Sequence, residues 1–169
     1  RHARRRRRGR RRGGRGRAIP AVARINLAPV NSLGLQHPDA VELTERGVAE
    51  DRRFYVTDAD GRLVGGVKYG PLARVRPEWD APAGRLELRF PDGVVVAGEI
   101  ELDEQVETDF FRIRVVSGRI VRGPFADALS DFVGARLRLV RVEDSDFATD
   151  VHPATLLSRA SAERLVADR

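Results

Sequence analysis

Short segments in which apolar and polar residues alternate run through most of the chain. The clearest lies at 85–90, where Leu86, Leu88 and Phe90 share one face and charged residues share the other. Because successive side chains of a strand point to opposite faces, this period of two predicts half-buried strands. Further strands are expected at 22–30, 40–43, 53–57, 63–67, 72–76, 94–97, 99–102, 110–116, 119–122 and 136–142.

Turn residues separate these strands at regular intervals. Asp58-Ala59-Asp60-Gly61 and Pro91-Asp92-Gly93 are expected to be hairpin turns, because glycine supplies the positive φ that such turns need. Glu45-Arg46-Gly47 and Ser117-Gly118 are expected to turn the chain as well. Many short strands joined by tight turns are typical of an all-β sandwich or a small barrel.

Two helices are expected near the C-terminal end. Apolar residues recur three and four positions apart from Phe125 to Val133, which predicts an amphipathic helix that ends at Gly134. A last helix is expected at Ala162–Asp168, capped by Ser158 or Ser161. No strand follows to cover that helix, so we expect the domain to continue in a longer protein.

These elements predict a mostly β chain of the α+β class. A small β-barrel or sandwich is followed by a helix–strand–helix unit that begins a second β-rich domain. We therefore expect three parts, which are a disordered arginine-rich arm at 1–17, a β-domain at 18–123 and an incomplete second domain at 124–169.

The composition is that of a soluble globular protein. Hydrophobic residues make up 41% and charged residues 33% of the 169 positions. No apolar run approaches the roughly 18 residues of a membrane span, and no apolar segment follows the basic N-terminus as it would in a secretory signal. We expect a cytoplasmic bacterial protein that has no membrane partner.

Charge divides the chain into two parts. Residues 1–17 contain 11 of the 31 basic residues and no acidic residue, which leaves 20 basic and 25 acidic side chains in the remainder. Such an arm is expected to bind nucleic-acid phosphates without sequence preference. Alternatively, the arm is GC-rich upstream sequence translated ahead of the true start. Either way the remaining 152 residues form a mildly acidic body with a net charge of −5.

Metal and thiol chemistry find little support in the sequence. The chain contains no cysteine, which excludes disulfides and thiolate ligands within these residues. The acidic residues that follow position 143 lack the glycine and the terminal glutamate of a calcium loop, so a solvated loop is expected. The histidines are too scattered to form a metal cluster and stand at His2, His37 and His152.

Two short motifs could bind an anion. In Asp51-Arg52-Arg53, strand alternation sends the two arginines to opposite faces, and a planar guanidinium facing a cleft suits a phosphate or a pterin carbonyl. The alternative is a structural salt bridge to Asp51 or Glu50. In the turn at 29–34, the Ser32 hydroxyl and the backbone N–H groups could cradle an anion, or the turn could be an ordinary one.

Together the two motifs resemble MOSC proteins, which bind molybdenum cofactor. That family has a Pro-[apolar]-Lys-Ser turn followed about twenty residues later by Asp-Arg-[Arg or aromatic], and Ser32 and Arg53 match it, whereas Asn31 replaces the lysine. The resemblance continues through 42–47, 58–61, 132–140 and 153–161, and covers roughly 22–169. It implies that the molybdopterin cofactor, through its phosphate and pterin, is bound by Asn31, Ser32, Arg52, Arg53 and His152.

The resemblance also implies an activity and partners. Family members reduce N-hydroxylated compounds or transfer sulfur, with a small-molecule substrate and an electron-transfer partner protein, and molybdenum ion and pyridoxal phosphate binding belong to the family. Its metal-ligating cysteine is absent from these residues, so this segment is expected to supply part of the cofactor site. The alternatives are a nucleic-acid-binding module that uses residues 1–17, and a non-catalytic cofactor-binding domain.

Overall fold

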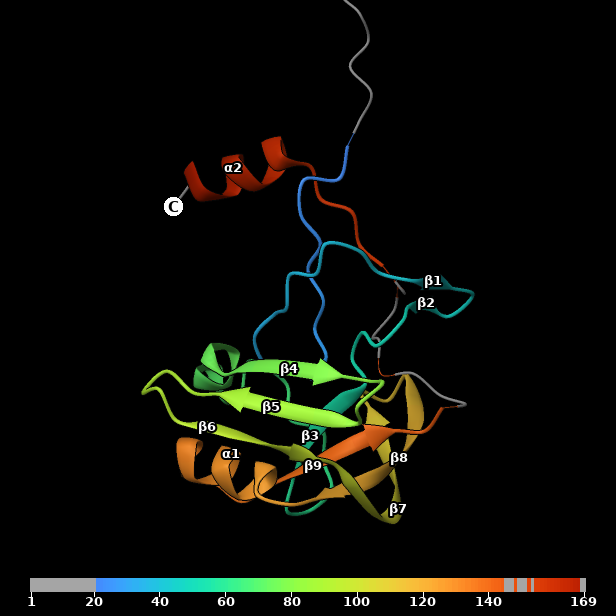
Figure 1. Cartoon of the computed structure of the whole chain (residues 1–169), viewed down its shortest axis with the longest axis vertical. Helices are drawn as coiled ribbons and strands as arrows, with labels where there is room; N and C mark the ends of the chain where they lie inside the picture. Colours follow the sequence, from blue (N-terminus) through green and yellow to red (C-terminus); the bar gives the residue numbers. More distant parts are fainter. Residues whose placement is uncertain (1–20, 145–147, 149–151, 153, 168–169) are drawn as a thin grey trace, which may run out of the picture.

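The computed structural model describes residues 21–144, 148, 152 and 154–167. The predicted arm at 1–17 and much of the predicted acidic loop lie outside the described residues. Within the described part, strands and helices follow one another as shown in Figure 1. They are β1 (Leu43–Thr44), β2 (Gly47–Val48), β3 (Phe54–Asp58), the 3₁₀ helix η1 (Gly70–Arg74), β4 (Arg76–Asp80), β5 (Arg85–Arg89), β6 (Val95–Glu99), β7 (Glu101–Phe110), β8 (Arg114–Arg122), α1 (Phe125–Val133), β9 (Leu137–Val142) and α2 (Arg159–Ala167).

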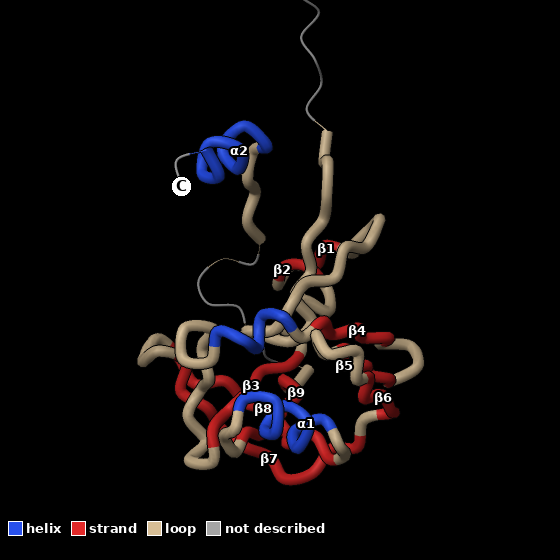
Figure 2. Tube along the Cα trace, turned by 90° about the vertical axis from the view of Figure 1, so that its left-hand side faces the viewer, coloured by secondary structure: helices blue, strands red, loops and turns tan. Residues whose placement is uncertain are grey.

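Two antiparallel sheets form the body. One has the strand order β3-β9-β8-β7 and the other has the order β4-β5-β6, while β1 and β2 form a separate hairpin. In Figure 1 the two larger sheets stack face to face, and α1 lies along one side of them. Figure 2 shows β1, β2 and α2 standing away from this body. The predicted mostly β fold with two α-helices is confirmed.

The core lies between the two sheets because alternate residues of β3 serve different faces. Phe54 and Val56 join a large cluster with Leu86 and Leu88 of β5 and with residues of α1 and β9. Tyr55 points the other way into a smaller cluster, where its ring lies 5.1 Å from that of Phe110. Both faces of β3 are therefore covered, so every residue from 54 to 57 is buried.

Several predicted elements are confirmed almost residue for residue. The strand predicted at 85–90 is β5, with Leu86, Leu88 and Phe90 all buried. The helix predicted from its three-and-four spacing is α1, and Gly134 ends it with a φ of 67°. Glycine is favoured there because a left-handed cap costs it little. The last helix, predicted at Ala162–Asp168, is α2 and begins three residues earlier at Arg159; the predicted cap Ser158 accepts a hydrogen bond from the Ser161 N–H through its hydroxyl at 3.0 Å.

Several of the predicted strands are wrong, including 40–43, of which only Leu43 belongs to β1. Residues 22–30 make only isolated bridges at Leu27 and Val30, because the segment runs outside both sheets. Residues 63–67 make only the bridge at Leu63, since Gly65 and Gly66 interrupt the segment two residues later. Residues predicted as the strand 72–76 mostly form η1, because proline in the first turn favours a helical start.

The hairpin predicted around Ser117-Gly118 is also wrong. The turn lies at 111–113, and both residues sit inside β8. A Cβ added at Gly118 would lie 2.6 Å from Val140 Cγ1 and 2.8 Å from the Arg141 carbonyl oxygen. The glycine is there because β9 packs closely against it, and glycine in a strand often marks such an approach.

The boundary predicted at 123/124 does not coincide with a break in the sheets. Strand β9 lies between β3 and β8, and α1 packs against β9. Residues 125–142 therefore belong to the same folded body as the preceding strands. Separately, no described helix is long and apolar enough to cross a bilayer.

A candidate anion site beside an acidic groove

The two motifs singled out in the sequence lie side by side. The Phe54 N–H donates to the Pro29 carbonyl at 2.9 Å, and the Asn31 N–H donates to the Phe54 carbonyl at 2.8 Å. Val30 and Phe54 thereby form a parallel bridge. This pairing holds the turn at 29–34 against the first residue of β3, directly beside Arg53.

Arg52 and Arg53 have different surroundings, although neither lies inside a strand. Arg52 sits in a turn with a φ of 50°, so strand alternation does not orient it as predicted. Its guanidinium pairs with Asp51, whose other carboxylate oxygen accepts the Ala28 N–H at 2.9 Å. The salt-bridge alternative therefore describes Arg52 well.

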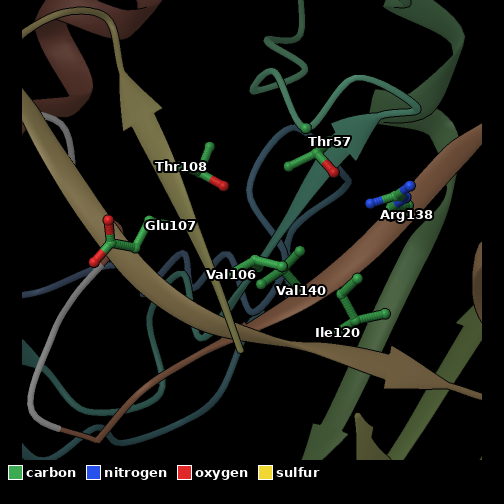
Figure 3. Close-up of a pocket in the computed structure, with 8 residues that line it drawn as sticks. Thr57, Val106, Glu107, Thr108, Ile120, Arg138 and Val140 are labelled. Carbon is green, nitrogen blue, oxygen red and sulfur yellow. The ribbon is translucent and has the colours of Figure 1, made fainter. Parts of the chain in front are cut away.

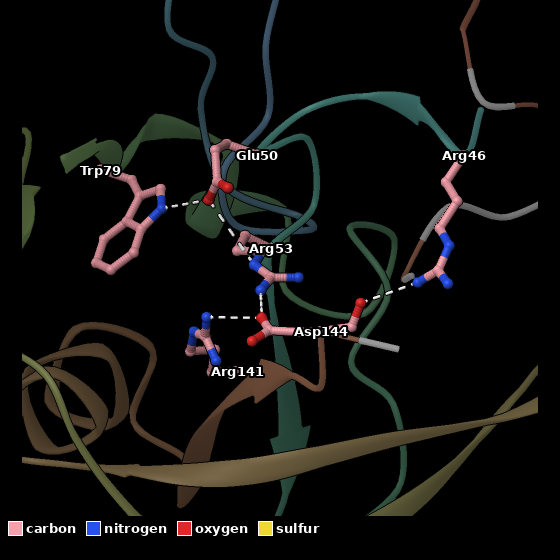
Figure 4. Close-up of polar contacts among 6 residues, drawn as sticks. All are labelled: Arg46, Glu50, Arg53, Trp79, Arg141 and Asp144. Atoms are coloured by element: carbon pink, nitrogen blue, oxygen red, sulfur yellow. Dashed lines mark hydrogen bonds and ion pairs between the residues drawn. The ribbon is translucent and has the colours of Figure 1, made fainter. Parts of the chain in front are cut away.

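Arg53 is the centre of a group of charged side chains that we call the Arg53 cluster: Arg46, Glu50, Arg53, Arg141 and Asp144 (Figure 4). The guanidiniums of Arg53 and Arg141 both contact the same Asp144 Oδ1, and the Arg141 distance is 3.0 Å. Arg53 Nε lies 3.7 Å from Glu50 Oε2. Arg46 donates to the backbone carbonyl of Asp144 at 2.9 Å.

The arginines are much more buried than the acid that joins them. The Arg53 and Arg141 side chains are 17% and 20% exposed, whereas Asp144 is 77% exposed. Burial lowers the pKa of Arg53, and the positive charge of Arg141 lowers this pKa further, while Glu50 and Glu143 oppose the shift. Arg53 Nε is buried and has no hydrogen-bond partner in the described part of the chain. The terminal nitrogens that contact the exposed Asp144 carboxylate, and not this buried Nε, are therefore the donors that face an external anion.

The other predicted cofactor residues are placed differently. The Ser32 hydroxyl donates to the Val64 carbonyl at 2.9 Å, so it helps hold the turn in place. Ser32 has a φ of 72°, and Asn31 reaches β3 through its backbone. His152 is exposed in the segment before α2 and is not among the described residues that pair with Arg53.

Sequence reasoning missed Arg141 and Asp144 as partners of Arg53. Arg141 lies opposite Phe54 in the β3–β9 register, and Asp144 is 91 positions from Arg53. No local motif links them. The only available signal was the position of an acidic loop directly after the predicted strand 136–142.

A groove adjoins the cluster along β4. We call it the β4 groove; it has a volume of about 750 Å³ and lies between β4 and the segment 35–42. Glu50 and Trp79 line it, and the Trp79 indole N–H donates to Glu50 Oε2 at 2.6 Å. Glu50 therefore belongs to the Arg53 cluster and to the groove wall at once.

A second, smaller pocket lies elsewhere on the body. It has a volume of about 190 Å³ and is lined by side chains that include Thr57, Glu107 and Arg138 (Figure 3). None of the predicted cofactor residues lines either pocket. Among the described residues no group of three or more His, Asp and Glu side chains is placed to hold a metal ion.

Comparison with known proteins agrees with this architecture. The family model described as the MOSC N-terminal beta barrel domain matches residues 19–137. A solution structure of a Bordetella bronchiseptica protein superposes with a TM-score of 0.50 at 20% identity, covering 73% of this chain and 92% of that one. At this identity the likeness concerns the fold alone. No curated protein matches the sequence.

Proposed function

The chain belongs to the MOSC N-terminal beta barrel domain family, and from this premise we propose that its Arg53 cluster binds the phosphate-bearing pterin of a molybdenum cofactor. The observation that carries the proposal is the convergence of two largely buried guanidiniums on one carboxylate oxygen. Arginine presents a planar fork of donors that matches phosphate and carboxylate geometry. Asp144 thus stands where an external anion would bind.

The residues present fit such a group for two reasons. Asp144 is mostly exposed, so its carboxylate can leave the arginines without disturbing the core. The Arg53 and Arg141 side chains are only 17% and 20% exposed, and charge-assisted hydrogen bonds from their terminal nitrogens to an anion are stronger than those between neutral groups. Arg46 adds a third positive charge on the exposed side.

When bound, the cofactor supplies the molybdenum chemistry, and the residues of this chain bind and orient it. Glu50 positions Arg53, and Trp79 fixes Glu50 through its indole N–H. The turn at 29–34 and Arg52 lie in segments next to Arg53. We propose Asn31, Ser32, Arg52 and His152 as further contacts of the cofactor. None of the 169 residues is a cysteine, so this segment supplies no thiolate to the metal.

For the whole protein we propose a cytoplasmic oxidoreductase or sulfurtransferase. It would act on a small-molecule substrate and take electrons from a partner protein. This proposal rests on family membership, because fold alone does not determine activity. The pterin site can be tested without assuming which reaction follows.

The test is the variant Arg53→Ala in the intact chain, with pterin content and inorganic phosphate affinity as readouts. We expect both to fall about tenfold or more, because a hydrogen bond to a charged group contributes about 1.5 to 3 kcal/mol. Arg122→Ala is the matched control, since this exposed arginine on β8 pairs with Asp103 away from the cluster. Unchanged pterin content in Arg53→Ala would overturn the proposal.

A further inference from the structure

The β4 groove is acidic, in contrast to the neighbouring arginines. Its lining contains four carboxylates, Glu42, Glu50, Glu78 and Asp80, and one arginine, Arg76. Three of the acids are exposed, and Glu50 is half-buried. A groove lined predominantly by one charge raises the local concentration of ligands of the opposite charge.

Strand β4 also presents an unfavourable charge pair. Glu78 lies directly opposite Glu87 across the β4–β5 ladder. Like charges in this position destabilise a sheet, and Arg89 forms an ion pair with Glu87. A cation placed beside Glu78 would reduce the repulsion between the two glutamates.

The walls of the groove suit a long, flexible cation. Leu35, Val41, Pro77 and Trp79 supply apolar surface between the carboxylates. Arginine side chains lay their methylene stems along apolar surface while the guanidinium reaches a carboxylate, and they also stack on aromatic rings. A volume of about 750 Å³ accommodates several such side chains.

The chain carries a segment of this chemistry. Residues 1–17 contain 11 arginines and no acid, whereas the rest has a net charge of −5. The described chain begins at residue 21 and reaches the body above β4 in both views, and Leu27 lines the groove (Figures 1 and 2). Nine intervening residues, 18–26, span about 30 Å when extended, enough for the arm to fold back.

We propose that the β4 groove binds the arginine-rich segment 1–17 of the same chain. Binding is electrostatic and therefore weakens as salt rises. While the arm occupies the groove, its arginines are withheld from nucleic-acid phosphates. The body thus holds the arm by a surface that meets the proposed pterin site at Glu50.

The first test uses Trp79, the only tryptophan of the chain, as a reporter inside the groove. In the intact chain, raising salt to about 0.5 M shortens the screening length to a few ångströms and should release the arm, which shifts the Trp79 emission. The double variant Glu78→Gln, Asp80→Asn should lose most of this shift. The double variant Glu101→Gln, Glu104→Gln removes the same charge from exposed positions on β7 and should keep it.

Limited trypsin cleavage of the arm gives an independent readout. At low salt the groove variant should lose the arm about three to ten times faster than the wild-type chain, because cleavage follows the population in which the arm is free. The β7 control should be cleaved at the wild-type rate. Equal rates in all three proteins would overturn the proposal.

Two further outcomes would also contradict it. A Trp79 shift that depends on protein concentration would place the arm in the groove of a second copy. Capture of duplex DNA by the intact chain with no change in Trp79 emission would mean that the arm is already free. If duplex DNA instead produces the same Trp79 shift as salt, the proposal is supported, because the DNA competes with the groove for the arm.

Discussion

The Arg53 cluster and the β4 groove lie next to each other but differ in charge, burial and shape. In the cluster, the Arg53 and Arg141 side chains are largely buried and the carboxylate that joins them, Asp144, is exposed. In the groove, carboxylates are spread along an open channel of about 750 Å³ with apolar walls. A compact anion fits the first and an extended cation fits the second. The two proposed ligands would therefore lie only a few side chains apart.

Glu50 forms the boundary between these two regions. One of its oxygens, Oε2, accepts the Trp79 indole N–H at 2.6 Å and also lies 3.7 Å from Arg53 Nε. Its charge helps stabilise the buried arginine and contributes to the acidic groove. We therefore predict that the charge of Glu50 weakens anion binding at the Arg53 cluster and strengthens cation binding in the β4 groove.

The largest effect is expected for Phe54→Ala, which should damage both regions together. Phe54 is fully buried, its ring lies 4.9 Å from that of Trp79, and its backbone holds the turn at 29–34. Truncating a buried phenylalanine costs about 3 to 5 kcal/mol through lost burial and the resulting cavity. Urea unfolding would measure this loss, and Trp79 emission would report the groove.

Phe111→Ala is the control for this variant. Phe111 is 58% exposed in the turn before β8 and should change the stability by no more than about 0.5 kcal/mol. If Phe54→Ala proved as mild as the control, the shared support of the two regions would be refuted.

The supporting framework was largely predictable from the sequence, because local patterns determine it. Alternation at 85–90 and the three-and-four spacing of α1 are each contained in one segment, and both were correct. Gly118 misled the prediction, since turn glycines and glycines under a packed strand look alike in sequence. The segment 22–30 misled it too, because apolar residues alone do not show that a partner strand exists.

The candidate site was only half predictable. The motif Asp51-Arg52-Arg53 indicates Arg53 as a candidate anion-binding residue, and the turn motif at 29–34 indicates Asn31 and Ser32. Their closeness depends on the bridge between Val30 and Phe54, and the contact with Arg141 depends on the register of β9 against β3. Such pairings join residues far apart in the chain, so periodicity within one segment does not contain them.

An intermediate effect is expected for Asp144→Asn, which should strengthen anion binding. The asparagine keeps an oxygen near Arg53 and Arg141 but removes the negative charge that competes with an external anion. We expect the affinity for inorganic phosphate to rise about three- to tenfold, in line with the modest energy of an exposed ion pair. Isothermal titration with phosphate measures this change.

Asp92→Asn serves as the control, because this exposed carboxylate sits in the turn between β5 and β6, where it accepts the Val94 N–H. Its phosphate affinity should match the wild-type value. A fall in affinity in Asp144→Asn would show that Asp144 organises the arginines instead of competing for them.

The smallest but most discriminating effect is expected for Glu50→Gln. The amide oxygen can still accept the Trp79 N–H, so the local packing is kept while the shared charge is lost. Phosphate affinity should rise about two- to threefold, and retention of the arm in the groove should weaken by a similar factor. Glu45→Gln, in the exposed β1–β2 turn, should alter neither quantity. Because the two expected changes have opposite signs, a general loss of structure cannot imitate them. Changes of the same sign would mean that the two regions do not share Glu50 in the way the contacts indicate.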